Sequence, residues 1–415
     1  MRSLGFDWFF LLLLFVLAVS VEAVLRALAP GRFERPRSRW IARALIMVGA
    51  ITVLAIESAS RSRAPAGGGV YRVPIAVIRS TAVALWVSSV LVTLWHLVAE
   101  IVGRTARAVR GFREPAEPAV AEPVPPPSKS PEDASTQQID RRSALVRVVD
   151  TAIITGVSGA VGYGLVKGRS DFRVREIEVR LPKLPRALDG YTIVQLTDLH
   201  VGVFAGPDDF RPMLDRTRAL RPDAIVLTGD LVDRHPRHVP DALRMFASLS
   251  ARDGVFAVLG NHDYYTDYRA VLRALERANV RALVNEHTII RPEDGGGFVL
   301  AGVDDVWAPR VAPGRAMDLR RALVGAPREA ARVLLAHNPK VFSTAHNAVD
   351  LQLSGHTHGG QINPASLASL ALEYVSGTYR SAHGTLFVSN GFGYTGAPVR
   401  LAAPPEIAKI VLVAG

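Results

Sequence analysis

The feature that most constrains this chain is a pattern that recurs five times between residues 191 and 360: a short β-branched run ends in a polar cluster. The five segments read YTIVQLTDLH, DAIVLTGD, GVFAVLGNHD, ARVLLAHNP and DLQLSGHTHGG. Amphipathic stretches such as DYRAVLRALERA lie between some of them, with apolar residues at helical spacing. Strands that alternate with helices predict βαβ units, in which ligands bind where the strands end. We therefore expect an α/β domain with its site at the carboxyl ends of the strands.

The polar clusters share one kind of side-chain chemistry. Their members are Asp198, His200, Asp230, Asn261, His262, Asp263, His337, His356 and His358. The chain has no cysteine, which excludes disulfides and thiolate metal ligands. Carboxylate, amide and imidazole groups together suit Mn, Fe or Zn. The clusters therefore indicate a metal site.

The spacing within the clusters favours close approach to a metal. In D-x-H and H-x-H, an extended backbone would point both side chains the same way, so that each pair binds from one face of a strand end. A glycine precedes Asp230, Asn261 and His356, and it would let the backbone turn sharply. Each motif alone is common in surface turns, and it is the ordered set that indicates function.

Taken in order, the D-x-H, GD, GNHD, H and GHxH motifs resemble those of the calcineurin-like metallophosphoesterase superfamily, over roughly residues 185–412. The forms GDLVD, HNP and SGHTHGGQ look like those of its membrane-associated bacterial branch. The resemblance implies a four-layer α/β/β/α sandwich. It also implies an enzyme that hydrolyses phosphate mono- or diesters or pyrophosphate bonds, acting on a phosphorylated small molecule or a lipid-linked substrate.

The resemblance further implies a role for each site residue. One divalent metal ion would be held by Asp198, His200 and His358, and a second by Asn261, His337 and His356, with Asp230 bridging the two. The ions would be Mn, Fe or Zn, and they would generate the hydroxide that attacks phosphorus. His262 would act as the general acid, and Asp263 would orient its ring.

Other polar residues near the motifs are expected to have lesser roles. Asp233 and Asp304 are expected to fix loops, and His235 and His238 to lie in a polar surface loop. Asn390 departs from the branch pattern, in which we expect a basic residue at this position.

The first 103 residues predict a membrane region. The mean hydropathy of the chain is +0.19, and apolar residues concentrate in three stretches, roughly 8–28, 41–56 and 80–102. The third has about the 20 residues that a helix needs to cross a bilayer, whereas the second is short enough for a re-entrant helix. Two or three transmembrane helices are therefore predicted.

A linker and a further apolar segment come next. Proline and charge are dense in residues 104–145, which favours an extended tether. Residues 146–167 are weakly hydrophobic and follow Arg141 and Arg142 closely, so they fit either a fourth membrane helix or an internal twin-arginine-like signal anchor. Residues 168–415 would then form the metallophosphoesterase domain.

The distribution of charge associates the chain with lipid. The net charge is +11, of which +8 falls in residues 1–167 and +3 in residues 168–415. The excess lies beside the apolar stretches, where arginines set topology and contact anionic lipid, so a bilayer is expected as partner and nucleic acid is not. The arginines of residues 29–43 and of the linker favour the cytoplasm, although the 57–79 loop also carries four. We expect a multi-pass protein of the cell membrane whose catalytic domain lies outside the cytoplasm.

Two other classes of protein compete with a membrane-anchored enzyme. A catalytically silent membrane sensor would bind metal or a phosphorylated ligand, but silent relatives typically lose a ligand or the general acid, and this chain keeps them all. A transport unit would need a central charged pair, whereas Glu22, Arg26, Glu57 and Glu100 lie toward the ends of the apolar stretches. Anchorage is the simpler account of the apolar segments.

Overall fold

The computed structural model describes residues 141–168, 170–202, 204–293 and 297–415, together with isolated positions between residues 80 and 105. Nearly all of the predicted membrane region and linker therefore lies outside the described residues. The chain divides into two compact units, one of Met1–Arg63 with Thr81–Ala160 and the other of Ala64–Ser80 with Val161–Gly415. Every predicted site residue belongs to the second unit.

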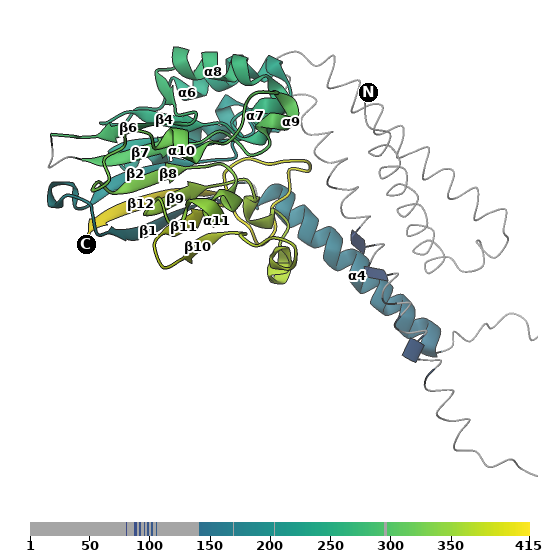
Figure 1. The fold of residues 1–415 in the computed structure, drawn as a ribbon. Coiled ribbons are helices and arrows are strands. Elements are labelled where there is room, and N and C mark those ends of the chain that lie inside the picture. The colour runs from purple at the N-terminus through teal and green to yellow at the C-terminus, as the bar shows by residue number, and fades with distance from the viewer. Residues whose placement is uncertain are drawn as a thin grey trace, which may run out of the picture. The chain divides into compact units, whose positions relative to one another are not determined.

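Two six-stranded sheets form the framework of the second unit (Figure 1). The first contains, in spatial order, β1 (Arg173–Leu181), β12 (Glu406–Ala414), β2 (Tyr191–Leu196), β3 (Ala224–Thr228), β4 (Val255–Val258) and β5 (Val280–Ala282). The second contains β10 (Gly377–Arg380), β11 (Thr385–Val388), β9 (Leu351–Ser354), β8 (Arg332–Leu335), β7 (Phe298–Gly302) and β6 (Glu286–Ile290). Strands β2 to β5 run parallel, as do β11, β9, β8 and β7, so the carboxyl ends of the central strands share one edge in each sheet.

The predicted strands match the observed ones. The five β-branched runs form β2, β3, β4, β8 and β9. All five residues of β3 are buried, which explains its continuous apolar run, because a strand covered on both faces has no solvent side. Each aliphatic side chain buried in this way contributes about 1.5–3 kcal/mol. The α/β prediction is therefore confirmed.

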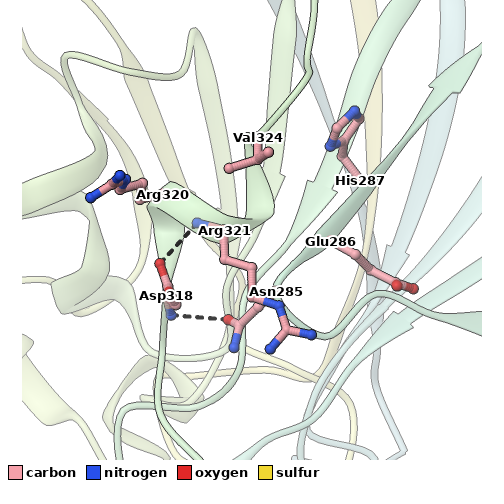
Figure 2. Close-up of a pocket in the computed structure, with 7 residues that line it drawn as sticks. All are labelled: Asn285, Glu286, His287, Asp318, Arg320, Arg321 and Val324. Carbon is pink, nitrogen blue, oxygen red and sulfur yellow. Dashed lines mark hydrogen bonds between the residues drawn. The ribbon is translucent and has the colours of Figure 1, made fainter.

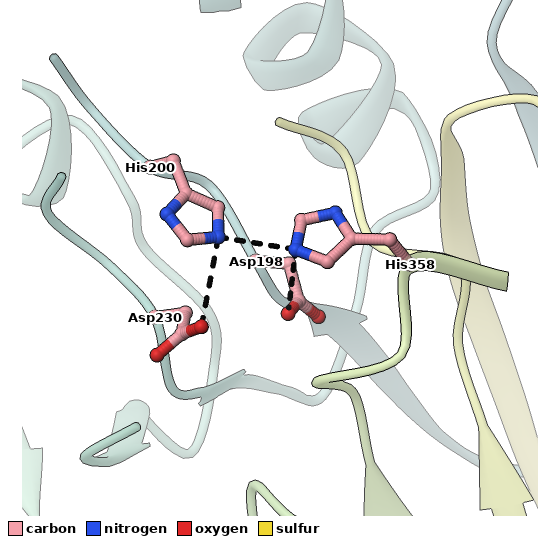
Figure 3. Close-up of side chains that lie close together, drawn as sticks. All are labelled: Asp198, His200, Asp230 and His358. Atoms are coloured by element: carbon pink, nitrogen blue, oxygen red, sulfur yellow. Dashed lines mark hydrogen bonds and ion pairs between the residues drawn. The ribbon is translucent and has the colours of Figure 1, made fainter. Parts of the chain in front are cut away.

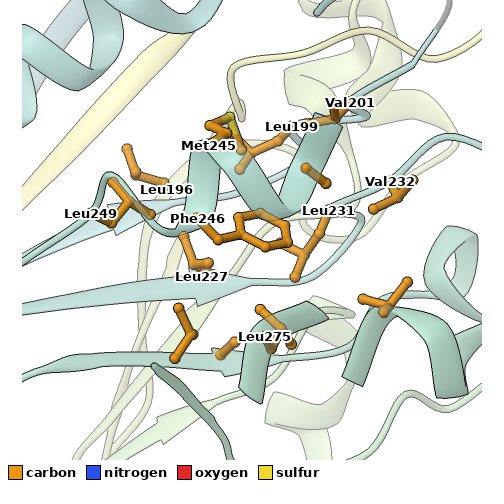
Figure 4. Packing of buried hydrophobic residues seen from close by; sticks show 14 of the residues in the cluster. Leu196, Leu199, Val201, Leu227, Leu231, Val232, Met245, Phe246, Leu249 and Leu275 are labelled. Carbon is orange, nitrogen blue, oxygen red and sulfur yellow. The ribbon is translucent and has the colours of Figure 1, made fainter. Parts of the chain in front are cut away.

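Three apolar cores define the layers. The middle core joins Ile193 and Val226 of the first sheet to Val333 and Leu351 of the second, so the sheets pack face to face. The outer face of the first sheet is covered by α5 (Arg211–Ala219), α6 (Val239–Phe246), α7 (Asn261–Thr266) and α8 (Tyr268–Arg277), with Phe246 and Leu275 in their core (Figure 4). Short helices α10 (Leu319–Ala322) and α11 (Phe342–Ala345) cover the outer face of the second sheet, and α9 (Ala308–Val311) contributes to the α7 side. This is the predicted four-layer α/β/β/α sandwich.

Helix α4 (Arg141–Val166) precedes the first strand of the sandwich. Its residues Ala144–Val166 are long and apolar enough to cross a membrane, with a hydropathy of 1.6, and only 12% of the window is buried. The helix covers all but the last residue of the apolar segment predicted at 146–167 and begins earlier, at the paired arginines. Its last turn belongs to the second unit, where Arg400 N donates a 3.3 Å hydrogen bond to Gly164 O.

Candidate functional site

The predicted site residues come together at the carboxyl ends of five strands. In the first sheet, Asp198, Asp230 and Asn261 follow β2, β3 and β4; in the second, His337 and His356 follow β8 and β9. All nine predicted residues are buried except His356, which is half-buried. Because the two sheets pack face to face, their carboxyl edges meet, and this brings together clusters that lie up to 160 residues apart.

The backbone of these clusters is not extended, which corrects the reason predicted for their spacing. Asp198 has φ 52° and His200 has φ 46°, and His356 and His358 have φ 74° and 53°. Asp230 also adopts the left-handed conformation, at φ 52°. Aspartate and histidine tolerate this region better than most residues, yet it still carries strain, and strain of this kind concentrates at functional sites. Left-handed turns, rather than strand alternation, point the side chains inward.

One half of the site consists of Asp198, His200, Asp230 and His358 (Figure 3). The Nε2 atoms of His200 and His358 lie 3.1 Å apart. His358 Nε2 lies 3.4 Å from Asp198 Oδ1, and His200 Nε2 lies 3.6 Å from Asp230 Oδ2. These ligand atoms all fall within 4.8 Å of one another, which is a spacing that a single metal ion can bridge.

The other half consists of Asp230, His337 and His356. His337 Nε2 lies 3.3 Å from Asp230 Oδ2 and 3.2 Å from His356 Nδ1. The opposite nitrogen of His337, Nδ1, donates to Thr228 O at 2.9 Å, which leaves Nε2 unprotonated in the neutral ring. Asp230 Oδ2 thus lies close to a histidine in each half, as the predicted bridging role requires.

Asn261 supplies the clearest sign that the site fits a cation. Its Oδ1 atom is buried and has no hydrogen-bond partner among the described residues. A buried amide oxygen without a partner costs roughly 1–3 kcal/mol, which a metal ion would offset. Together with the converging imidazole and carboxylate atoms, this residue fits the predicted ligand set for two divalent ions.

Three glycines give the backbone the room that the site needs. A Cβ atom on Gly260 would lie 2.3 Å from Asp230 Oδ1, and one on Gly355 would lie 2.2 Å from Asp198 Oδ2. Gly229 has φ 88°, and a Cβ atom there would lie 2.7 Å from His337 Nδ1. The glycine prediction is confirmed in part: only Gly229 makes a turn that favours glycine, but each of the three positions lets the backbone of one cluster approach the side chain of another.

Burial sets the charge state of the histidines. It lowers the pKa of His200 and of His356 to about 4, so both rings are neutral near pH 7, which is the form that binds metal. His337 behaves differently: burial lowers its pKa, but Asp230 and further carboxylates outweigh burial and raise it well above the ordinary value. The carboxylates around His337 therefore favour a positive charge at the position where the second metal ion is predicted.

His262 lies beside the metal ligands as predicted, but its carboxylate neighbour is a different residue. Asp263 does not contact the His262 ring; its two oxygens accept hydrogen bonds from the backbone amides of Gly260, Leu231 and Val232. The carboxylate of Asp233 lies 3.6 Å from His262 Nδ1 instead. The implied role of Asp263 in orienting the ring is therefore wrong, and Asp233, expected only to fix a loop, is placed to orient it.

Asp263 instead holds the loops that carry the ligands. It ties the turn before Asn261 to the segment that follows Asp230, through amide hydrogen bonds of 2.8 to 3.1 Å. Burial, followed by the charge of Asp230, raises the pKa of Asp263 to about 7. Its contribution to the site is thus to position the backbone.

The structure adds two residues that the sequence did not indicate. Arg400 is fully buried, and its guanidinium donates to the carbonyls of Gly393, Asn390 and Ala403 while Nη2 lies 3.4 Å from His358 Nδ1. It supplies a cation beside Asn390, where a basic residue was expected. Asp305 follows β7 at the edge of the second sheet next to β8, and its Oδ2 is buried without a hydrogen-bond partner among the described residues.

Two of the lesser predictions have mixed outcomes. Asp304 accepts hydrogen bonds from Tyr264 and Arg315, which confirms that it fixes loops. His235 is exposed as expected, but His238 is buried, and its Nε2 accepts a 3.2 Å hydrogen bond from Arg237.

A pocket of about 500 Å³ lies away from these clusters, where α10 covers the start of β6 (Figure 2). It is lined by Asn285, Glu286, His287, Asp318, Arg320, Arg321 and Val324. None of the predicted site residues lines it. Asn285 accepts a 3.0 Å hydrogen bond from the Asp318 amide, so the Asn285 side chain holds the pocket wall together.

Comparison with known proteins supports the family. Residues 191–360 match the family model described as calcineurin-like phosphoesterase. The chain is 36% identical over 294 residues to a "Transmembrane protein with metallophosphoesterase domain" of Danio rerio, covering 69% of this chain and 66% of that protein. It thus spans just under two thirds of that relative's length.

The chain covers a larger share of a bacterial relative. The chain is 34% identical over 287 residues to an "Uncharacterized metallophosphoesterase" of Helicobacter pylori, covering 67% of this chain and 75% of that protein. A solved "dimetal phosphatase" from Danio rerio is 15% identical, with 54% of this chain and 94% of that chain covered and a TM-score of 0.36, and the assignment does not depend on it. From the matched motifs, the clustered ligands and these relatives, the chain belongs to the calcineurin-like phosphoesterases.

Proposed function

We propose that this protein is a membrane-anchored hydrolase of phosphate mono- or diesters or of pyrophosphate bonds, with a dinuclear metal centre. One observation carries the proposal: Asp230 Oδ2 lies 3.6 Å from His200 Nε2 and 3.3 Å from His337 Nε2. A single carboxylate oxygen between two histidine clusters is the arrangement that two metal ions need in order to share a ligand. The seven predicted ligands are Asp198, His200, Asp230, Asn261, His337, His356 and His358.

Divalent ions bound there would lower the pKa of a water molecule and neutralise the phosphate oxygens. The chain itself would supply the proton for the leaving group. Because Asp233 lies at Nδ1 of His262, the Nε2 atom of that ring would donate the proton to the leaving oxygen. The backbone amide of His262 donates a 2.8 Å hydrogen bond to Asp230 Oδ1, which fixes the acid relative to the bridging ligand.

The charge of His262 suits a general acid. Burial lowers the pKa of its ring, but Asp230 and Asp233 outweigh burial, so the net pKa lies above the ordinary 6.5. The two carboxylates thus shift the ring toward its protonated form. Because all seven ligands and His262 are present, no observation favours the alternative of a catalytically silent sensor.

Membrane anchorage rests on two observations. Helix α4 is apolar and long enough to span a bilayer, and two vertebrate relatives bear the name "Transmembrane protein with metallophosphoesterase domain". We further propose a multi-pass protein of the cell membrane whose catalytic domain lies outside the cytoplasm, with a phosphorylated small molecule or a lipid-linked phosphate as substrate.

Activity of the purified full-length protein tests the reaction. We expect hydrolysis of at least one of p-nitrophenyl phosphate, bis(p-nitrophenyl) phosphate and a pyrophosphate diester in the presence of Mn²⁺, Fe²⁺ or Zn²⁺. Chelation with EDTA should abolish turnover, and adding back metal should restore it. A protein that binds metal but turns over none of these substrates would overturn the proposal.

Cells test the location. An impermeant phosphodiester should be hydrolysed equally by intact and lysed cells if the site faces outward. Activity that appears only after lysis would place the site inside. Resistance of the chain to alkaline carbonate extraction separates an integral protein from a peripheral one.

A further inference from the structure

An exposed apolar turn lies directly after the last predicted metal ligand. The 3₁₀ segment η8 (Pro364–Leu370) buries none of its side chains, and its sequence PASLASL carries no charge. Leu370 is 84% exposed and Leu367 is 55% exposed. Apolar side chains gain free energy by leaving water, so two leucines on one uncharged turn make a candidate contact surface.

Hydrogen bonds hold η8 in a fixed place. Asn363 Oδ1 accepts a 2.8 Å hydrogen bond from the Ala368 amide, and Asn363 Nδ2 donates a 3.0 Å bond to Gly359 O. A Cβ atom on Gly360 would lie 2.6 Å from Ala368 Cβ, so the turn packs closely on the glycines that follow His358. The leucines therefore project from an ordered turn that is attached to the metal centre.

The same turn lies close to the end of α4. Leu401 N donates to Gln361 O, and Asn363 N donates to Leu401 O, both at 2.9 Å. On its other side this segment meets α4: a Cβ atom on Gly164 would lie 2.7 Å from Val399 Cγ1. Residues 399–401 therefore contact both the end of α4 and the residues that lead into η8.

The position of the Gly164 contact along α4 sets the level of residues 399–401 relative to the bilayer. The apolar stretch of α4 ends at Val166, and Gly164 lies two residues before that end, about 3 Å along the helix axis. Around the same turn, Tyr163 and Val166 are 54% and 69% exposed, and Lys167 follows. An aromatic ring and a lysine at the end of an apolar helix are typical of the bilayer interface.

We propose that η8 is a second membrane contact, with Leu367 and Leu370 inserted among the phospholipids of the bilayer that α4 enters. This inference rests on the membrane anchorage proposed above. It follows because the segment beside Gly164 lies at the level where α4 leaves the bilayer, and that segment is hydrogen-bonded to Gln361 and Asn363, the residues that lead into η8. The His358 side of the metal centre then faces the headgroup layer, within reach of a phosphate attached to a lipid.

The absence of cysteine in the chain allows a direct test. Leu370→Cys and Leu367→Cys would each be labelled with an environment-sensitive nitrobenzoxadiazole dye in the full-length protein. The protein would be reconstituted in vesicles of phosphatidylcholine and phosphatidylglycerol in equal parts. Val324→Cys is the matched control, because Val324 is 67% exposed and lies on the connection from α10 to the amino end of β8, away from the site.

We expect blue-shifted emission at positions 367 and 370, and quenching there by doxyl-labelled phospholipid, with neither effect at position 324. A signal at 370 equal to that at 324 would overturn the inference. So would a blue shift that lipid-borne doxyl does not quench, because a protein partner or a second copy of the chain would then cover the leucines.

Two controls separate this inference from the proposed function. Loss of the chain from vesicles in alkaline carbonate would refute the anchorage and the inference with it, whereas a retained chain with an unquenched label refutes the inference alone. Leu370→Asp should keep hydrolysis of soluble bis(p-nitrophenyl) phosphate within about twofold, because substitution of an exposed side chain away from the ligands has little effect on stability. Failure of the wild-type protein on that substrate speaks against the enzymatic proposal and leaves the labelling result unaffected.

Discussion

Each half of the metal site has two histidines and shares Asp230, but the histidines of the two halves have opposite surroundings. Behind His358 lies a cation, with Arg400 Nη2 3.4 Å from its Nδ1, and burial together with His200 and Arg400 lowers the pKa of His358 well below the ordinary value. Behind His337 lies an acceptor, the carbonyl of Thr228, and Asp305 contributes negative charge nearby. The His337 half therefore attracts a cation more strongly than the His358 half, and Asp230 connects the two.

This difference shows that the metal affinity of a site depends on the neighbours of its ligands as well as on the ligands themselves. A neighbour that accepts a hydrogen bond from the ring nitrogen facing away from the metal makes an imidazole a better metal ligand. A cation beside that nitrogen makes it a poorer one. We expect the two ions to bind with unequal affinity, the ion of the His337 half more tightly. Four substitutions test this difference between the halves.

Asp230→Asn should have the largest effect, because it removes the ligand that both halves share. We expect the rate constant kcat to fall by at least about 10³-fold on every substrate. Bound metal, measured by plasma mass spectrometry after dialysis, should fall below the wild-type content. Near-normal activity with two ions bound would contradict the bridging role.

His262→Gln should leave both halves intact and remove the proton donor. We expect kcat to fall by about 10²–10⁴-fold on substrates with a poor leaving group and far less on p-nitrophenyl esters, which leave without protonation. Metal content should be unchanged. An equal loss on good and poor leaving groups would rule out a general acid, and His346→Gln, remote from the ligands, serves as the control.

Arg400→Met should disturb the His358 half alone. Removing the buried guanidinium leaves the carbonyls of Gly393 and Ala403 without their donor, so the free energy of unfolding should fall by about 1–3 kcal/mol for each carbonyl. Denaturation of the metal-free protein measures this effect without contribution from the ions. Arg400→Lys, which keeps the charge, should recover part of the loss; no change in either variant would show that the cation is not structural.

Asp233→Asn should have the smallest effect, about a tenfold fall in kcat, because Asp233 acts through His262. Asp233 helps to raise the pKa of His262, so its loss lowers that pKa. A general acid works only while protonated, so the alkaline limb of the profile of kcat against pH should move to lower pH. An unmoved limb with reduced kcat would indicate a merely structural role.

Much of the fold could be predicted because local patterns carry it. Short apolar runs that end in polar clusters identified β2, β3, β4, β8 and β9, since a strand buried on both faces has no polar alternation. Strand β12 was not predicted as a partner of β2, to which it is antiparallel, because no local signal says which strands pair across more than 200 residues.

The candidate site, like the fold, could be predicted from local sequence only in part. Its ligands were read from motifs, but their left-handed backbone was not, because D-x-H spacing fits both an extended strand and a turn. Asp263 was assigned to His262 because the two are adjacent in sequence, whereas the folded chain points the Asp263 carboxylate at backbone amides and brings Asp233 to the ring.

From the amino-acid sequence alone we could identify the residues that can bind metal and the order in which successive strands carry them along the chain. Those properties depend on side-chain chemistry and on local hydrophobic pattern, which each segment carries alone. The neighbours of the ligands are visible only in the folded chain, where Thr228 O contacts His337 and Arg400 lies beside His358. The same is true of the contact between the end of α4 and Val399. Such neighbours come from distant segments and are fixed by how the sheets pack, so no short stretch of sequence contains them.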